Sequence, residues 1–162
     1  VGRCRPVVSA ATPADAEGIA ALWNVVIRDT VATFTTVEKT AADVAGAIAR
    51  QPFFVARSGG RVTGFATAFQ FRSGPGYVHT LEHSIHVADD AKGRGLGRAL
   101  LTRLEDHART AGTHSLIAAI SGENADGIAF HATLGYTRIA RLPQVGWKFG
   151  RWHDLVLMQK FL

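Results

Sequence analysis

Between a predicted strand and a predicted helix lies the stretch Lys92-Gly93-Arg94-Gly95-Leu96-Gly97-Arg98. Its glycines let the backbone approach a ligand closely and turn N–H groups toward it, and the start of a helix adds partial positive charge. Together these features predict an anion-binding loop, most naturally one for phosphates. The alternative is an ordinary glycine-rich turn whose basic side chains point to water, and the glycines alone do not decide between the two.

Two common phosphate-binding motifs do not fit this stretch. A dinucleotide-binding fingerprint needs a small residue at its third glycine position, where the two possible alignments place Arg98 or Leu100. A P-loop needs Gly-Lys followed by Ser or Thr, and that triplet does not occur in the chain. The sequence therefore excludes both motifs.

Helical and strand patterns alternate on both sides of the loop. Helices are predicted where capping residues precede apolar residues at helical spacing, and strands where β-branched and aromatic residues follow turn signals. The predicted helices begin at Thr12-Pro13, at Thr40, near Gly95 and at Asn124. The predicted strands cover 53–57, 61–71, 77–87, 115–120, 136–140 and 154–161, with Gly59-Gly60 joining the first two as a hairpin. This pattern predicts one α/β domain, residues 1–162, with a mixed central β-sheet flanked by helices.

The composition limits the class of protein. Of the 162 residues, 47% are hydrophobic, so the chain can bury a core. Cys4 is the only cysteine, which fits a reducing compartment, and neither an export segment nor a run of roughly 18 apolar residues occurs. We therefore expect a cytoplasmic protein. Lys and Arg number 18 against 13 Asp and Glu, and the net charge of +5 leaves nucleic acid, a membrane surface or an anionic small molecule open as partners.

The loop and the strand before it resemble two motifs of one enzyme family. Lys92-x-x-Gly95-x-Gly97 is similar to the Gln/Arg-x-x-Gly-x-Gly/Ala signature of the GCN5-related N-acetyltransferase (GNAT) family, with Lys at the first position. The strand Thr80-Leu81-Glu82-His83-Ser84-Ile85-His86-Val87 resembles the Val-Glu-x-Ser/Thr-Val-Tyr-Val strand of the phosphinothricin and methionine sulfoximine acetyltransferases.

The same subgroup supplies likenesses to the rest of the chain. Its Asn-x-x-x-x-x-x-His-x-x-x-Gly-Phe pattern resembles Asn124, His131, Gly135 and Tyr136. Residues 146–154 resemble its Gly-x-Lys-x-Gly-x-Trp-x-Asp segment. Asn24, followed by residues 30–34, resembles its Asn…Thr-x-x-Thr-Phe segment. The likeness covers nearly the whole chain, in the order of the family.

The resemblance implies the GNAT fold, acetyl-coenzyme A as cosubstrate and acetyl transfer to an amine. In the family, the loop holds the pyrophosphate of the coenzyme on backbone amides, and Asn124 bonds the pantetheine arm. The implied cofactor-binding residues are Ile85, His86, Val87, Lys92, Gly93, Arg94, Gly95, Leu96, Gly97, Arg98, Asn124 and His131.

Glu82 is the candidate catalytic base, acting directly or through a water. An aliphatic ammonium must lose a proton before its nitrogen can attack a thioester. On a strand Glu82 shares a face with Ser84 and His86, and half-burial would raise its pKa toward a useful range. The alternative is a Glu that caps the sheet edge or pairs with an Arg.

His131 is predicted as a catalytic general acid for the departing thiolate or as a coenzyme contact, and a structural helix histidine is its alternative. Asn124 also reads as an ordinary helix N-cap. No Gly-x-Ser-x-Gly elbow occurs, and Cys4 precedes the first predicted element, so direct attack in a ternary complex is preferred over an acyl-enzyme.

No metal site is predicted. His79 and His83 point to one side of their strand and His86 to the other, so the three rings cannot converge on an ion.

The amine acceptor is expected to be a small primary amine of the phosphinothricin or methionine sulfoximine type. Phe71-Arg72 matches a Phe-Arg pair of the subgroup, which implies that Arg72 clamps an acidic group of the acceptor. Gly74 and Val78 stand where relatives commonly place further Arg residues. The residues implied to bind the acceptor are Phe34, Arg72, Glu82, Lys148 and Trp152.

Other functions remain open. A family member could instead acetylate a polyamine, an aminoglycoside or a protein N-terminus, and the charge alone would allow a non-catalytic nucleic-acid-binding module. The basic residues are scattered, however, with their one dense group in the glycine loop, so we assign that charge to the coenzyme and expect neither nucleic acid nor a membrane as partner. The resemblance also implies a homodimer.

Overall fold

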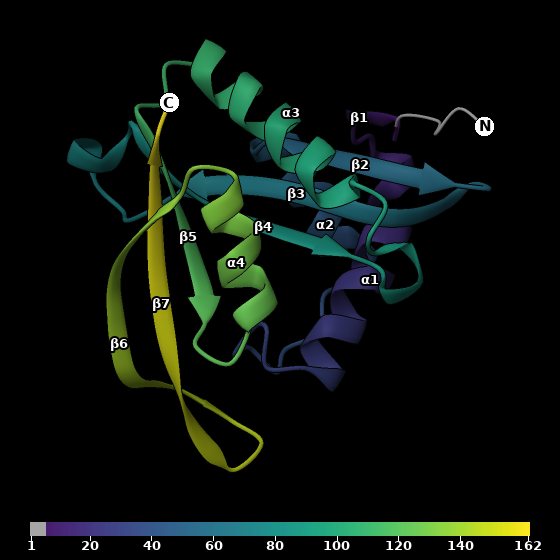
Figure 1. Cartoon of the computed structure of the whole chain (residues 1–162). Helices are drawn as coiled ribbons and strands as arrows, with labels where there is room; N and C mark the ends of the chain where they lie inside the picture. The colour runs from purple at the N-terminus through teal and green to yellow at the C-terminus, as the bar shows by residue number, and fades with distance from the viewer. Residues whose placement is uncertain (1–5) are drawn as a thin grey trace.

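The structure is a computed structural model that describes residues 6–162, so Cys4 lies outside the described residues. Seven strands form one sheet in the order β1-β2-β3-β4-β5-β7-β6 (Figure 1). Only β4 and β5 run parallel, and every other neighbouring pair is antiparallel. The strands are β1 (Val8–Ala10), β2 (Phe53–Ser58), β3 (Arg61–Gln70), β4 (Thr80–Val87), β5 (Ser115–Ser121), β6 (Thr137–Lys148) and β7 (Arg151–Phe161). The predicted mixed sheet is confirmed.

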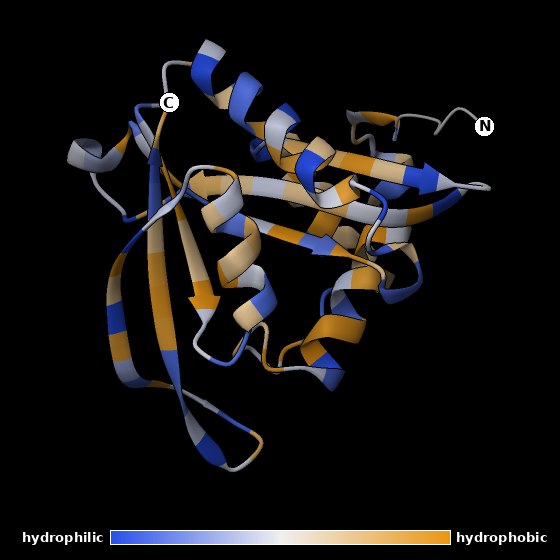
Figure 2. Ribbon diagram, viewed as in Figure 1, coloured by the Kyte–Doolittle hydropathy of each residue, from blue (hydrophilic) through white to orange (hydrophobic). Residues whose placement is uncertain are grey.

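Helices cover both faces of this sheet. They are α1 (Ala16–Asp29), α2 (Ala41–Arg50), α3 (Leu96–Thr110) and α4 (Ala125–Thr133). On one face, α1 and α2 bury Ile19 and Val44 in a cluster with Phe65 of β3. On the other face, α3 buries Leu100 and Leu104, and Figure 2 shows apolar residues along the central strands beneath it. Within residues 6–162, no helix has the length and apolar character needed to cross a membrane.

Local signals in the sequence set where several elements begin. The Thr40 hydroxyl accepts a bond from the Asp43 N–H (3.0 Å), and the Asp43 carboxylate accepts one from the Thr40 N–H (2.9 Å), a capping box that starts α2. Gly59 and Gly60 adopt φ of +57° and +78°, which the tight turn between β2 and β3 requires.

Some strand boundaries differ from those predicted. Residues 8–10 form an edge strand that the sequence pattern did not indicate. The strand predicted from residue 77 begins at Thr80, because 75–77 form a short 3-10 helix with Pro at its start. β6 and β7 are longer than predicted, because they pair along most of their length, from Thr137 opposite Gln159 to the hairpin tip.

The parallel strands β4 and β5 separate halfway along. Their pairing runs from Thr80 and Ser115 to His83 and Ala118, after which β4 continues along β3 and β5 continues along β7. Figure 1 shows the two arrows diverging. Within the described chain, the β5-facing backbone edge of 84–87 therefore has no strand partner and is available to a ligand.

Candidate active site

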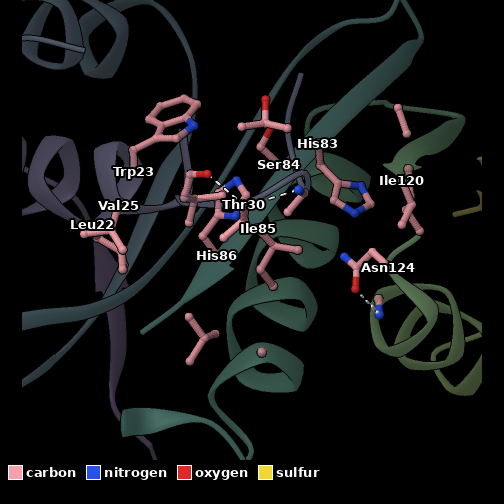
Figure 3. A pocket seen from close by; sticks show the side chains of 18 of the residues that line it. Leu22, Trp23, Val25, Thr30, His83, Ser84, Ile85, His86, Ile120 and Asn124 are labelled. Carbon is pink, nitrogen blue, oxygen red and sulfur yellow. Dashed lines mark hydrogen bonds between the residues drawn. The ribbon is translucent and has the colours of Figure 1, made fainter. Parts of the chain in front are cut away.

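A cavity of about 1370 Å³ opens where β4 and β5 separate. Its walls come from α1, segment 30–39, α2, β4, segment 88–98, the end of β5, and α4 (Figure 3). The predicted phosphate loop and the predicted base Glu82 both line this one cavity.

The glycine loop presents backbone amides. Gly93 and Gly95 have φ of +77° and +80°, a left-handed conformation that glycine adopts without a side-chain clash. The first hydrogen bond of α3 runs from the Ala99 N–H to the Gly95 carbonyl (3.0 Å), so the N–H groups of 96–98 precede the helix ladder. Three free amides at the positive end of a 15-residue helix suit a pyrophosphate.

Basic side chains surround these amides. Lys92 and Arg98 line the cavity, whereas Arg94 does not. The Lys92 ammonium lies 2.8 Å from the Asp89 carboxylate, and both side chains are exposed. The predicted cofactor-binding residues that line the cavity are Ile85, His86, Val87, Lys92, Gly93, Gly95, Leu96, Gly97, Arg98, Asn124 and His131.

Glu82 carries a half-buried carboxyl group into the cavity. It stands between Phe69 of β3 and Ile117 of β5, and this burial raises its pKa above the usual value. Among residues 6–162, its carboxylate makes no ion pair or hydrogen bond. The alternative of a Glu paired with an Arg is therefore not seen here.

The side chains of β4 alternate between the two faces as expected. His86 packs near Trp23 and Phe65, with ring centroids 6.3 and 5.4 Å away, on the face that α1 and α2 cover. Ile85 and Val87 pack on the opposite face, against the α3 cluster. Burial, with the nearby Lys92 charge, lowers the pKa of His86 to about 4, so its ring is neutral near neutral pH.

His131 forms a buried pair with His83 that sequence reasoning missed. Its Nδ1 lies 2.7 Å from the Gly127 carbonyl oxygen, so Nδ1 carries the proton and Nε2 accepts. The two Nε2 atoms are 2.9 Å apart, so His83 donates to His131 and its own buried Nδ1 has no partner in the described chain. Burial lowers the pKa of both rings, that of His83 to about 3. In this arrangement, both N–H groups of the pair are already donated, so His131 has no free N–H for the thiolate, and its general-acid role stays a prediction.

Asn124 caps α4 and also faces the cavity (Figure 3). Its Oδ1 accepts a hydrogen bond from the Gly127 N–H (2.9 Å), which leaves its amide NH₂ for a ligand. Both predicted roles of Asn124 are therefore compatible.

The residues implied to bind the acceptor do not all reach the cavity. Phe34 and Glu82 line it. Arg72 lies outside the lining, in an exposed turn after β3, with its guanidinium 6.0 Å from the centre of the Tyr77 ring. Trp152 also lies outside it, 55% exposed near the β6–β7 hairpin tip.

Lys148 lies behind the cavity wall rather than in it. Its side chain is buried, with 1% of the residue exposed, and its ammonium donates to the carbonyl oxygens of Thr30 (2.6 Å) and Thr33 (2.9 Å). A lysine whose donors hold backbone carbonyls is not placed to clamp an acceptor, so the structure replaces the predicted contact with a structural one.

Two cations of the cavity were not singled out from the sequence. Lys39 and Arg50 line it from the segment before α2 and from the end of α2. The Asn24 side chain fixes the Lys39 backbone by bonding its N–H (2.7 Å) and its carbonyl (2.8 Å), and the Lys39 ammonium lies 4.7 Å from the Trp23 ring centre. The Asn24 motif was a signal for this contact, whereas α2 reads as an ordinary amphipathic helix.

No group of three or more His, Cys, Asp or Glu residues able to hold a metal ion occurs within residues 6–162.

Comparisons with known proteins agree with this geometry. The acetyltransferase (GNAT) family model matches residues 20–136. The chain is 42% identical to the L-amino acid N-acyltransferase MnaT of Escherichia coli K12, over 92% of this chain and 90% of the relative. It is 41% identical to the L-methionine sulfoximine/L-methionine sulfone acetyltransferase of Salmonella typhimurium, with the same coverage of both chains.

A solved structure extends the likeness to three dimensions. The crystal structure of a GNAT phosphinothricin acetyltransferase from Sinorhizobium meliloti, in complex with acetyl-coenzyme A, aligns with a TM-score of 0.92 and 30% identity, over 98% of this chain and 89% of that one. The glycine loop, the separated strands and these likenesses together mean that the chain is an N-acetyltransferase that uses acetyl-coenzyme A, and that it belongs to the GNAT family.

Proposed function

We propose that this protein acetylates the primary amine of a small amino-acid-like acceptor, of the methionine sulfoximine or phosphinothricin type. The observation that carries the proposal is the unpaired, half-buried carboxylate of Glu82, which opens into the same cavity as the phosphate loop. The names of the two relatives and of the Sinorhizobium structure supply the acceptor class.

The cavity has separate parts for the two substrates. Amides 96–98, with Lys92 and Arg98, would hold the pyrophosphate, and the β4 edge with Asn124 would hold the pantetheine arm, which supplies the acetyl thioester. The acceptor half is formed by α1, α2 and the segment that contains Phe34.

Glu82 lies between these two halves and takes the proton from the acceptor ammonium, directly or through a water. The neutral amine then attacks the thioester carbonyl in a ternary complex, the C–S bond breaks, and coenzyme A leaves as a thiolate, which takes up the second proton that the new amide nitrogen loses. That leaving group has a pKa of about 8.5 as a free thiol, so it needs only modest help from an acid.

Lys39 and Arg50 supply positive charge for an acidic group of the acceptor. Both line the acceptor half, and neither forms a salt bridge among residues 6–162. They thus serve in place of Arg72, which lies outside the lining.

The test measures thiol release from acetyl-coenzyme A with methionine sulfoximine, phosphinothricin, a polyamine and an aminoglycoside as separate acceptors. Release well above background with the first two supports the proposal, and preference for a cationic acceptor overturns it. R50M should raise the KM for an acidic acceptor by about ten-fold, the loss of one charge-assisted hydrogen bond. R109M, an exposed change on α3 outside the cavity, is its matched control.

A homodimer in the cytoplasm, without nucleic acid or membrane as partner, remains our expectation. Exposed apolar side chains gather on the β6–β7 hairpin, where a second copy could cover them: Ile139, Val145, Trp147, Phe149 and Trp152. Light scattering after gel filtration measures the mass, and a monomer at all concentrations would contradict the expectation.

A further inference from the structure

The β6–β7 hairpin holds segment 30–34 of the cavity wall from behind. Besides the two bonds from Lys148, the hairpin contributes the His153 ring, which stacks on Phe34 with centroids 5.4 Å apart and planes 22° apart. Gly146 makes room for this packing, because a Cβ at that position would lie 2.6 Å from Phe34 Cε2. Phe34 is therefore a wall residue whose place depends on a strand hairpin more than 100 residues later.

The partners of His153 determine its charge. The residue is 2% exposed, its Nε2 lies 2.8 Å from the Lys148 carbonyl oxygen, and its Nδ1 contacts Glu123 Oε2. Hydrogen bonds from Arg151 and His153 hold the pKa of Glu123 at about 2, so the carboxylate is ionised and only accepts. Since a carbonyl also only accepts, His153 satisfies both partners only when both ring nitrogens carry protons.

The charges around the ring suit an imidazolium. Glu123 faces it from the connection between β5 and α4, and Arg151 binds the same carboxylate through two bonds of 3.0 and 2.8 Å. Lys148 faces it from β6 with its backbone carbonyl, while its ammonium is directed to segment 30–34. The Phe34 ring covers one face of His153, an arrangement that favours a cation.

We propose that Glu123, His153 and Lys148 act as positioning residues that hold Phe34 and its segment in the acceptor wall, with His153 as an imidazolium. The role in acceptor binding rests on the proposed function, which assigns this wall to the amine. Loosening the wall should therefore weaken amine binding and leave the coenzyme half of the cavity intact.

The kinetic test compares H153F with G146A. H153F keeps an aromatic ring beside Phe34 but removes both donors, whereas G146A displaces Phe34 and leaves every charge in place. Each should raise the KM for the amine about ten-fold, with the KM for acetyl-coenzyme A changed less than about two-fold. H114F, on an exposed histidine that does not line the cavity, is the matched control. An equal loss for both substrates would mean a general structural role and overturn the proposal.

Nuclear magnetic resonance gives a readout that does not depend on activity. In the wild type, both His153 ring nitrogens should show the signals of protonated imidazole, and the amides of 31–35 should shift in H153F and in G146A but not in H114F. A neutral His153 ring, or unmoved amides in both variants, overturns the positioning role. If the wild type acetylates no amine, only the proposed function is overturned. The ring-nitrogen signals of His153 and the amide shifts of 31–35 still test whether His153 positions Phe34.

Discussion

Replacing Glu82 by Gln tests the assignment of the catalytic base most directly. Gln keeps the size of the side chain and its place between Phe69 and Ile117, but it cannot take a proton. A positioned general base contributes about 10²–10⁴-fold to a rate, and because this carboxylate has no competing ion partner we expect kcat to fall about 10³-fold. The KM for acetyl-coenzyme A should stay close to that of the wild type, since the glycine loop is untouched.

The pH dependence sharpens this test. The wild-type rate should fall on the acidic side as Glu82 becomes protonated, with a midpoint above its usual pKa because burial raises it. Burial also lowers the pKa values of His83, His86 and His131, so the E82Q variant is what assigns the acidic limb to Glu82. E82Q should lose the acidic limb of the thiol-release profile, and E17Q, an exposed change at the start of α1, should keep it.

The folding stability should depend on pH in the opposite sense to the rate, rising as Glu82 becomes protonated. With its pKa raised in the fold, Glu82 binds more protons folded than unfolded between its ordinary and raised pKa values, so its contribution to stability is lost as pH rises through that window. Gln mimics the protonated form, so the Tm of E82Q at neutral pH should exceed that of the wild type. An E82Q enzyme with full rate, or with an unchanged acidic limb, would refute the assignment.

Three further changes probe the loop and the scaffold. G95A places a side chain at φ +80°, at a cost of about 1–2 kcal/mol, and should weaken acetyl-coenzyme A binding about ten-fold by calorimetry; unchanged affinity would contradict the loop assignment. Burial works to raise the pKa of Asp15, but bonds from Arg57 and Thr12 outweigh it, so the stability that Asp15 contributes should be lost as pH falls below its unfolded value of 3.8. In D15N, the slope of Tm against pH should become shallower in that acidic range, and a slope identical to the wild type would refute this. K160M leaves the buried Glu105 carboxylate without its partner at 2.6 Å and should lower the free energy of unfolding by about 2 kcal/mol, measured by urea titration. A smaller loss than for R109M would exclude the pair as a stabilising contact.

Local sequence predicted most of the helices and strands and the position of the glycine loop. Capping residues, glycine turns and apolar periodicity act within a few residues, so Thr40, Gly59-Gly60 and 92–98 could be interpreted without a structure. Alternation along one strand likewise placed Glu82 and His86 on the same face, because that depends only on strand geometry.

The tertiary structure alone decided what those residues face. His83 and His131 are 48 positions apart, and Lys148 meets Thr30 across 118 positions, so neither contact leaves a periodic trace in the sequence. The acceptor-binding residues were the hardest to predict, since a motif shows which residue type is present but not which way its side chain points. Arg72, Lys148 and Trp152 have suitable chemistry but lie outside the cavity lining. Arg50 reaches the cavity because α2 packs against the sheet, and Lys39 reaches it from the segment before α2, where Asn24 holds its backbone. Burial, which raises the pKa of Glu82 and lowers that of His86, likewise exists only after distant elements have packed around these side chains.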